Sequence, residues 1–317
     1  MNSSMLNSNA AGAGYAQARV EEVEASFREL MEINESQVTP LSKALLHVLD
    51  HPGSLVRSRI AWNVGMNCGL ASEGALRLAT AVEYFHTASL IFDDLPSMDH
   101  ARMRRGVPCV HTIYGESVAM LTALAFVNRA YSLIWTETSK LLPRLARDIT
   151  TFVEECLGAK GVLAGQYRDL NFRPGPEATK EILQISMGKT VTLLRLSLCL
   201  PAMVANAPAR TTSLLRRLAV FRGLGYQIAD DFKDVFQSEA VSGKTTDRDR
   251  QLLRPNIVAS EGVPSAARRL ASLVKQGDCC QKQLRSRQGN WRFLDQLRIT
   301  VGPDLINESG IPLSGNL

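Results

Sequence analysis

The sequence predicts an all-α protein built as a single large helical bundle, and three observations support this prediction. From Tyr15 onward, apolar residues recur at three- and four-residue spacings, as at Val20, Val23 and Phe27, which is typical of amphipathic helices. Neither an alternating strand pattern of useful length nor an internal repeat is found. Several predicted helices are apolar on more than one face, a pattern that favours the centre of a bundle.

The predicted helices follow one another with short breaks. Residues 1–14 are rich in Asn, Ser, Ala and Gly; we expect them to be disordered and residues 15–317 to form one domain. After amphipathic patterns over 20–31 and 41–49, longer helices are predicted over 71–92, 115–138, 143–164, 177–205 and 211–235. Proline-containing loops at 173–176 and 207–208 separate the last three. Residues 303–317 are predicted to be a loose tail.

The composition is that of an ordinary soluble protein, with 45% hydrophobic and 21% charged residues. The net charge of +5 is not concentrated in one block. The densest basic patches, Arg102–Arg105 and Arg248–Arg250, each follow an acidic cluster. This placement suits a phosphorylated small molecule better than a nucleic acid, so nucleic-acid binding is not expected.

The cysteines and the apolar stretches indicate a cytoplasmic location. The six cysteines show no C-x-x-C spacing and no secretory signal precedes them, so reduced thiols are expected. Within the predicted long helices, the longest uncharged stretch, Ser117–Asn128, is much shorter than the ~20 residues that span a bilayer. No transmembrane segment is therefore expected.

Two acidic clusters carry the strongest functional signal. Asp-Asp-Leu-Pro-Ser-Met-Asp occupies Asp93–Asp99 and Asp-Asp-Phe-Lys-Asp occupies Asp230–Asp234, each after an apolar helical stretch. Carboxylates beside an apolar wall are costly to desolvate unless a cation neutralises them. Mg²⁺ prefers one or two carboxylates together with substrate phosphates. The pair of clusters therefore predicts a site that binds a diphosphate through several Mg²⁺ ions.

The residues around these clusters resemble the trans-isoprenyl diphosphate synthases, also called polyprenyl synthetases, in particular the geranylgeranyl and farnesyl diphosphate synthases. The order and spacing of the motifs hold from roughly residue 40 to 260. The matching segments are His86–Asp99 with Arg104-Arg105-Gly106, Gly165-Gln166-Tyr167-Arg168-Asp169, Lys189-Thr190, Gly225–Asp234 and Gly243-Lys244. The resemblance implies the isoprenoid synthase type I fold around a central apolar cavity, and a homodimer.

The resemblance also implies a role for each matched residue. Asp93 and Asp99 would bind two Mg²⁺ ions and Asp230 a third, with Asp94 and Asp234 as nearby or alternative ligands; Mn²⁺ could replace Mg²⁺. The implied catalytic residues are Asp93, Asp94, Asp99, Lys189 and Asp230. The residues implied to bind the substrates are Arg57, His86, Arg104, Arg105, Lys189, Thr190, Gln227 and Lys244.

The implied reaction joins an allylic prenyl diphosphate to isopentenyl diphosphate. Metal ions and cationic side chains neutralise the leaving diphosphate, so the allylic C–O bond ionises. Isopentenyl diphosphate then attacks the carbocation, and the released diphosphate takes up the proton. A water-poor helical interior would protect the cation from quenching.

The segment that should bind isopentenyl diphosphate departs from the family pattern. The family has G-G-K-R-x-R-P, but here Ser54 and Leu55 replace two cations and Arg57 is retained. Losing them should cost on the order of several kcal/mol, since a charge-assisted hydrogen bond contributes ~1.5–3 kcal/mol. Three functions remain open: a chain-elongating synthase, which we favour, a terpene synthase that does not use isopentenyl diphosphate, and a non-catalytic regulatory subunit. The intact aspartates argue against the last.

Two small residues predict the product length. Ala88 and Ser89 precede Asp93 by five and four residues, which places them ~6–7.5 Å below the reacting carbon. In the short-chain members of the family that this sequence resembles, a bulky aromatic there stops the growing chain near fifteen carbons. The insertion Pro96-Ser97 also resembles the geranylgeranyl-forming group. We therefore expect a twenty-carbon product, geranylgeranyl diphosphate.

Overall fold

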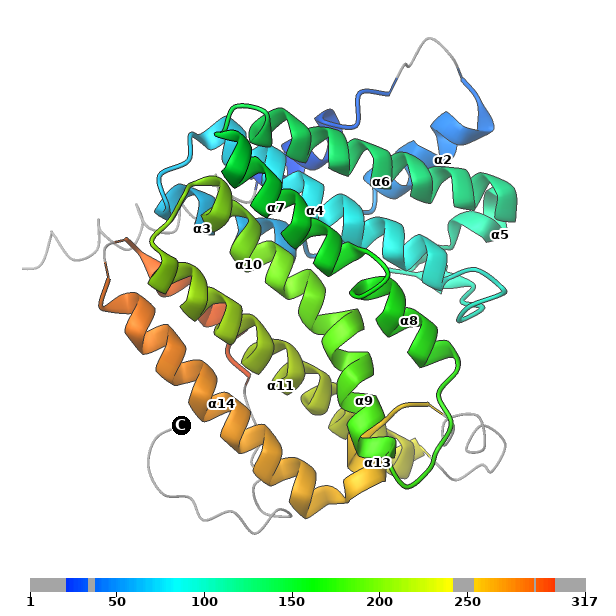
Figure 1. Ribbon diagram of the computed structural model, residues 1–317. Coiled ribbons are helices and arrows are strands. Elements are labelled where there is room, and N and C mark those ends of the chain that lie inside the picture. Colours follow the sequence, from blue (N-terminus) through cyan, green and yellow to red (C-terminus); the bar gives the residue numbers. More distant parts are fainter. Residues whose placement is uncertain (1–20, 34–37, 242–253, 288, 300–317) are drawn as a thin grey trace, which may run out of the picture. The chain divides into compact units, whose positions relative to one another are not determined.

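The computed structural model describes residues 21–33, 38–241, 254–287 and 289–299, and the surroundings of side chains 236–241 are not described. The chain divides into two compact units, Met1–Ala146 and Arg147–Leu317. The all-α prediction is confirmed, because the described residues form helices apart from one two-stranded hairpin (Figure 1). Residues 1–14, Lys244 and the tail 303–317 lie outside the described residues, and the single-domain organisation stays a prediction.

The first unit is built around one long central helix, α4. A helical segment over residues 21–29 comes first. The elements that follow are α2 (Pro40–Leu49), α3 (Val56–Asn67), α4 (Ser72–Asp93), β1 (Met103–Arg104), β2 (Val107–Pro108), α5 (Val110–Tyr114) and α6 (Glu116–Thr138). Both α3 and α6 pack against α4. The predicted helices over 71–92 and 115–138 are therefore confirmed to within one residue at each end.

An aromatic cluster fixes α4 in this unit. The ring of Tyr84 lies 5.3 Å from that of Phe27 and 5.1 Å from that of Phe126 on α6, both in edge-on geometry. The hydroxyl of Tyr84 donates to the carbonyl of Phe27 at 2.8 Å, so its polar group is paired inside the core. These contacts fix the middle of α4, so the C-terminal end of the helix, which carries Asp93, extends from a well-packed part of the core.

The remaining helices lie in the second unit, apart from residues 143–146 at the start of the first of them. They are α7 (Pro143–Leu157), α8 (Val162–Leu170), α9 (Ala178–Ser186), the π-helical turn η1 (Met187–Val191), α10 (Thr192–Val204), α11 (Ala209–Val241), α13 (Ile257–Glu261), α14 (Val263–Arg285) and the 3₁₀ helix η2 (Trp291–Leu297). Helix α11 packs between α10 and α14, and the three run side by side in Figure 1. Its buried face carries Ile228 and Phe232, which pack with Ile182 and Leu270 in one hydrophobic core.

Two predicted helices of this unit differ from the observed ones. The helix predicted over 143–164 breaks between Leu157 and Val162, and at this break the backbone is so close that a side chain at Gly161 would collide with the carbonyl of Cys156. The helix predicted over 177–205 is continuous from Ala178 to Val204 but contains the π-helical turn. Both differences come from close backbone contacts that a periodic pattern does not encode.

Two helical stretches, Glu116–Thr138 and Ala178–Val204, are long and apolar enough to cross a membrane by length and composition alone. The second has 61% of its most apolar window buried inside the protein, as expected for a core helix. The first has only 39% of that window buried. Helix α6 therefore leaves part of its apolar surface exposed.

Candidate active site

The first acidic cluster lies at the C-terminal end of α4. Asp93 is the last residue of the helix and Asp94 follows it as the C-cap. The chain then turns back, because the amide of Asp99 donates to the carbonyl of Asp93 at 2.8 Å. Asp93 is half-buried and Asp99 is exposed, whereas Asp94 is buried. One tight turn thus brings the backbones of Asp93 and Asp99, the two predicted metal-binding residues, together.

The carboxylate of Asp94 faces Arg104 on β1. Both Nε, at 2.9 Å, and a terminal nitrogen of Arg104 donate to the same oxygen of Asp94. This pairing raises the pKa of the Arg104 guanidinium, chiefly through the hydrogen bond with Asp94. Asp94 therefore orients Arg104 in this structure, and direct contact between Arg104 and a diphosphate stays a prediction.

The sequence Arg104-Arg105-Gly106 forms the tip of the hairpin. Arg104 pairs with Val107, so Arg105 and Gly106 are the two turn residues, with φ angles of 54° and 80°. Positive φ at both positions is the requirement of a type I′ turn, which explains the glycine. The guanidinium of Arg105 donates to the carbonyl of His51 at 3.0 Å. It fits there because position 53 is a glycine, and the Cβ of any other residue would collide with the guanidinium of Arg105.

Arg57, Arg104 and Arg105 form a cationic group in the first unit, and the neutral side chain of His86 lies next to Arg57. Nη1 of Arg57 lies 3.1 Å from Nε2 of His86, so the guanidinium donates and the imidazole is neutral. Burial, followed by the charges of Arg57 and Arg105, holds the pKa of His86 well below its usual value. The Nδ1 atom of His86 is buried and has no hydrogen-bond partner among the described residues. With Nε2 accepting, Nδ1 carries the proton and is available to donate.

Ser54 and Leu55, the two loop residues that differ from the family pattern, have different surroundings. Ser54 is exposed, but Leu55 is only 2% exposed and has a φ of 48° as the N-cap of α3. Leu55 is therefore a core residue. The loop differs from the family pattern in more than the exchange of a phosphate-binding cation for leucine. The local backbone places this side chain away from solvent.

The second acidic cluster lies on α11 in the second unit. Asp231 is buried and accepts hydrogen bonds from Nε2 of Gln227 at 3.0 Å and from the amide of Ile257 at 2.8 Å. Burial raises the pKa of Asp231 to about 6. Asp230 is half-buried and Asp234 is exposed. Burial and then the neighbouring charge of Asp230 raise the pKa of Asp234.

Both clusters therefore share one arrangement. The second aspartate, Asp94 or Asp231, is buried and held by its own protein partners. The first and last carboxylates are more exposed to solvent. The motif thus combines one carboxylate that supports the local structure with two that can reach a ligand.

Lys189 and Thr190 lie in the π-helical turn η1 of the second unit. The turn crosses α8 where two glycines meet: a Cβ on Gly188 would lie 2.6 Å from the Cα of Gly165. The amino group of Lys189 forms a 2.6 Å ion pair with Asp169. Single π turns are frequent at functional sites, where they displace a side chain from the regular helical position.

Thr190 connects this turn to the second acidic cluster. Its hydroxyl donates to Oε1 of Gln227 at 3.0 Å, and the amide of Gln227 donates in turn to Asp231. Gln227 thus has both ends of its amide paired, which fixes its orientation. This network gives Thr190 and Gln227 hydrogen-bond partners within the protein. Their contact with substrate, which the family resemblance implies, stays a prediction.

The donor sets fit magnesium. Within the described parts of the chain, no three His, Cys, Asp or Glu side chains converge as a metal cage. Each cluster instead offers its first and last carboxylates. In the second cluster, burial and then the charge of Asp230 raise the pKa of Asp234, although Lys233 pairs with Asp230 at 3.6 Å. Mg²⁺ is usually bound by one or two carboxylates, and phosphate and water oxygens complete its coordination. Asp93 and Asp99, or Asp230 and Asp234, would hold it.

Two residues were missed by the sequence reasoning. Asp169, the ion-pair partner of Lys189, ends the matching segment that begins at Gly165, but the sequence analysis predicts no role for it. Glu83, a buried carboxylate on α4, accepts a hydrogen bond from the amide of Ser58, the residue after Arg57. Its spacing of three residues before His86 puts it on the same side of the helix, and this was the available signal.

The chain-length residues have different exposure. Ala88 is 1% exposed, whereas Ser89 is half-buried and donates its hydroxyl to the carbonyl of His86 at 2.7 Å. Their role in product length stays a prediction.

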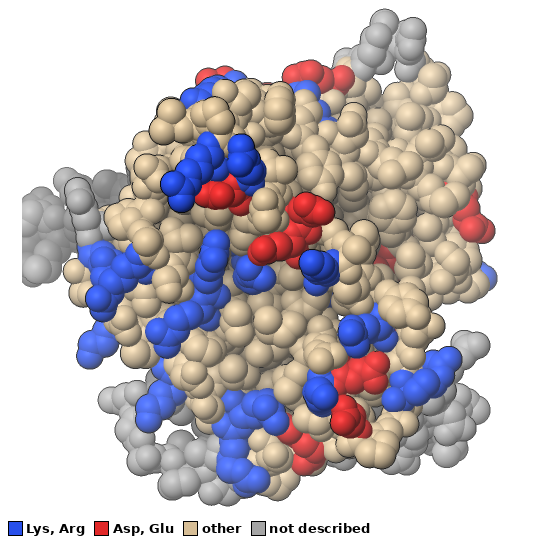
Figure 2. Space-filling view, viewed as in Figure 1, with Lys and Arg blue, Asp and Glu red and all other residues tan. Residues whose placement is uncertain are grey.

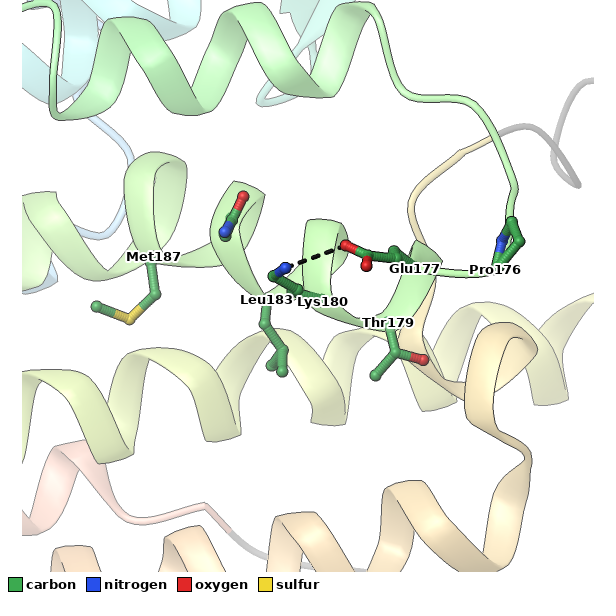
Figure 3. Close-up of a pocket in the computed structure, with 7 residues that line it drawn as sticks. Pro176, Glu177, Thr179, Lys180, Leu183 and Met187 are labelled. Atoms are coloured by element: carbon green, nitrogen blue, oxygen red, sulfur yellow. Dashed lines mark hydrogen bonds and ion pairs between the residues drawn. The ribbon is translucent and has the colours of Figure 1, made fainter.

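Other surface features do not point to a different site. A shallow groove of about 510 Å³ runs along α9, where Leu183 and Met187 lie beside the 3.0 Å ion pair of Lys180 and Glu177 (Figure 3). It contains none of the predicted site residues. On the face shown in Figure 2, basic side chains lie in separate groups, several of them next to acidic ones.

Comparisons with known proteins identify the family of this chain. The family model "Polyprenyl synthetase" matches residues 38–287. The geranylgeranyl diphosphate synthase of Pantoea ananas is 36% identical over 169 residues, which cover 53% of this chain and 56% of that protein, just over half its length. The farnesyl diphosphate synthase of Geobacillus stearothermophilus is 30% identical over 247 residues, covering 78% and 82%.

The fold is similar to that of solved structures. The geranyltransferase of Helicobacter pylori, complexed with magnesium and isoprenyl diphosphate, superimposes with a TM-score of 0.73 at 24% identity, over 90% of this chain and 95% of that one. This likeness shows the fold. Together with the family match over most of the sequence, it defines an all-α protein with the isoprenoid synthase fold. The chain belongs to the polyprenyl synthetase family, whose relatives named above are prenyl diphosphate synthases.

Proposed function

We propose that this protein condenses an allylic prenyl diphosphate with isopentenyl diphosphate and releases geranylgeranyl diphosphate. The observation that carries the proposal is the cationic group of the first unit. Arg57, His86 and Arg105 come together there despite the altered loop. An enzyme that only ionises one diphosphate would not need this second set of donors.

The residues divide the work between two diphosphates. Arg57, Arg105 and Nδ1 of His86 would bind the acceptor, because all three present N–H donors. Arg104 and Lys189 would bind the allylic diphosphate after leaving their partners Asp94 and Asp169. We propose that both acidic clusters act on that same diphosphate. Bound magnesium would supply the charge that stabilises the leaving group.

We also propose how many metal ions bind and which metals can serve. The chemistry of the donor sets fits three Mg²⁺ ions, two held by Asp93 and Asp99 and one by Asp230 with Asp234, and Mn²⁺ offers the same hard-cation chemistry. Titration of activity against each metal in a chelator-treated enzyme tests this part. Absence of any metal requirement would contradict it. We also propose a cytoplasmic location.

A product assay tests the function directly. The enzyme is incubated with radiolabelled farnesyl diphosphate, with and without isopentenyl diphosphate, and hydrocarbon products are extracted with and without phosphatase. We expect product only when isopentenyl diphosphate is present, and extraction only after phosphatase treatment. Consumption of the allylic substrate alone, with a product that extracts directly, would replace the synthase by a terpene synthase.

The terpene synthase remains the second candidate because of one specific observation. The loop that binds isopentenyl diphosphate in the family offers an exposed serine, Ser54, and a core leucine, Leu55, where cations are expected. The ionising residues do not depend on this loop. The same assay therefore decides between the two candidates.

The substitution Ser54→Lys should restore part of the acceptor site. Ser54 is exposed in the loop beside Gly53, so a lysine can be accommodated there. We expect the KM for isopentenyl diphosphate to fall about three- to tenfold, the worth of one partly solvated charge contact. The KM for the allylic diphosphate should not change.

Two variants serve as controls for that measurement. Ser139→Lys adds the same charge at another exposed position, the C-cap of α6, and should leave both KM values unchanged. Leu55→Arg would bury a cation in the core and should lower the melting temperature. If Ser54→Lys and Ser139→Lys behave alike, the loop does not contact the acceptor.

We also propose that a second copy of this chain covers the exposed face of α6. Leu121, Leu124, Tyr131 and Trp135 recur at three- to seven-residue spacings on one side of the helix and are 45–70% exposed. Contiguous apolar surface of this kind marks an interaction site. The spacing suits packing against an identical helix, which fits the homodimer implied by the family resemblance.

Trp135→Glu should weaken the dimer. We expect the wild type to sediment at twice the chain mass and the variant to shift towards the monomer at micromolar concentration, because a charge would be buried at the interface. Exposed Tyr167→Glu on α8 is the matched control. A monomeric wild type, or a wild type that pellets with lipid vesicles through this face, would contradict the dimer.

A further inference from the structure

The further inference concerns Glu83, a buried carboxylate on α4 one turn before His86. Its side chain is 2% exposed. Its Oε2 accepts a hydrogen bond from the backbone amide of Ser58, on α3, at 3.0 Å. A charged group is placed in a core only at a cost, so a buried glutamate needs a specific reason.

The first reason is the start of α3. The helix begins after Leu55, whose side chain has no group that could cap the free amides of the first turn. Glu83 supplies the missing acceptor from a neighbouring helix, and a negative charge at a helix N-terminus is favourable. The capped amide belongs to Ser58, the residue directly after Arg57. Glu83 thereby fixes the backbone from which Arg57 extends.

The second reason is charge. Desolvation raises the pKa of Glu83, and the nearby guanidinium groups of Arg57 and Arg105 oppose this shift. Burial lowers the pKa of Arg105, and the charge of Glu83 opposes that. The carboxylate is thus close to two cations that come from different elements, α3 and the hairpin turn. Without it, these two like charges would repel each other across a partly buried site.

We propose that Glu83 is a positioning residue for the acceptor diphosphate: it caps α3 and holds Arg57 and Arg105 in the arrangement that binds isopentenyl diphosphate. The inference rests on the proposed function. A negative charge also repels a diphosphate, so two effects of opposite sign compete. Positioning prevails because the geometry of two guanidinium groups determines how many of their donors reach the phosphate oxygens at once.

Two substitutions separate the cap from the charge. Glu83→Gln keeps an acceptor oxygen for the amide of Ser58 but removes the charge. Glu83→Ala removes both. We expect the KM for isopentenyl diphosphate to rise at least threefold in the first and at least tenfold in the second, with the KM for the allylic diphosphate within twofold of wild type. Calorimetric titration with isopentenyl diphosphate should show the same order of dissociation constants.

Glu137 provides the matched control in the same unit. It is 7% exposed and pairs with Arg77 at 2.8 Å and Lys140 at 2.9 Å. Arg77 lies nine residues before His86 on α4, about 13.5 Å along the helix. Glu137→Gln and Glu137→Ala should lower the melting temperature without changing the ratio of the two KM values.

The outcomes are distinct. If the Glu83 variants lose thermal stability but keep the wild-type ratio of KM values, Glu83 is only structural and the inference is wrong. A lower acceptor KM in Glu83→Gln would show that repulsion outweighs positioning and would also overturn it. A wild type that neither binds nor consumes isopentenyl diphosphate would remove the proposed function together with the inference. A wild type that uses it, with unaffected variants, removes the inference alone.

Discussion

Asp93→Ala and Asp230→Ala should each lower turnover by about 10²–10³-fold or more while leaving the fold intact. Each removes a carboxylate that is half-buried and placed to reach a ligand. Interactions that stabilise charge developing on a leaving group have effects of this size. Since carboxylates gathered for a metal repel one another without it, the melting temperature of the metal-free protein should stay level or rise.

The buried aspartates of the same clusters should behave differently. Asp231→Ala would leave the amide of Ile257 and the side chain of Gln227 without their acceptor. An orphaned buried donor costs about 1–3 kcal/mol, so we expect a lower melting temperature as well as lower turnover. Asp94→Ala should likewise release Arg104.

Circular dichroism melts and steady-state rates in saturating Mg²⁺ measure both effects. Asp148→Ala, on the exposed side of α7, is the control for loss of one negative charge and should change neither. Near-normal turnover in Asp93→Ala or Asp230→Ala would refute the metal assignment. Equal loss of stability in all four cluster variants would refute the division of labour within each cluster.

The sequence predicted the fold well because its signals are local. Helical periodicity located α4 and α6 to within one residue at each end. The acidic clusters were also evident, since each is a contiguous run at the polar end of an apolar helix. Features of this kind depend only on neighbours along the chain.

The features that escaped prediction depend on contacts between distant segments. The π-helical turn forms where Gly188 meets Gly165, and neither glycine alone indicates it. The burial of Leu55 depends on a left-handed backbone at the start of α3. Glu83 looks like any other polar residue within a helix until α3 is packed beside it. A periodic pattern records which face is buried but not which partner lies opposite.

The same distinction applies to the chain-length residues. At 3.6 residues per turn, Ser89 lies about 40° around α4 from Asp93, whereas Ala88 lies about 140° away. The structure agrees with this geometry, since Ser89 is half-buried like Asp93 and Ala88 is only 1% exposed. Ser89 is therefore the more direct place to block a chain that grows from the Asp93 end, and Ala88 is the more tightly packed.

Replacing Ser89 with Phe should change the main product from twenty carbons to fifteen. The added ring would lie about one turn, ~6 Å, below the reacting carbon and would occupy the path of the fourth isoprene unit. Ala88→Tyr should shorten the product too, but with a loss of about 1–3 kcal/mol of stability, because the larger ring must enter a packed interface. Ser89→Ala removes the hydroxyl without adding volume and should leave the product unchanged.

Chromatography of the dephosphorylated products measures the outcome, with melting temperatures recorded for each variant. An unchanged twenty-carbon product from both bulky variants would place the floor of the cavity elsewhere, and the small size of Ala88 would then reflect helix packing alone. A wild type that stops at fifteen carbons would reject the prediction for both positions. The difference in stability between the two bulky variants tests the structure independently of the product, since Ala88 is buried and Ser89 is half-buried.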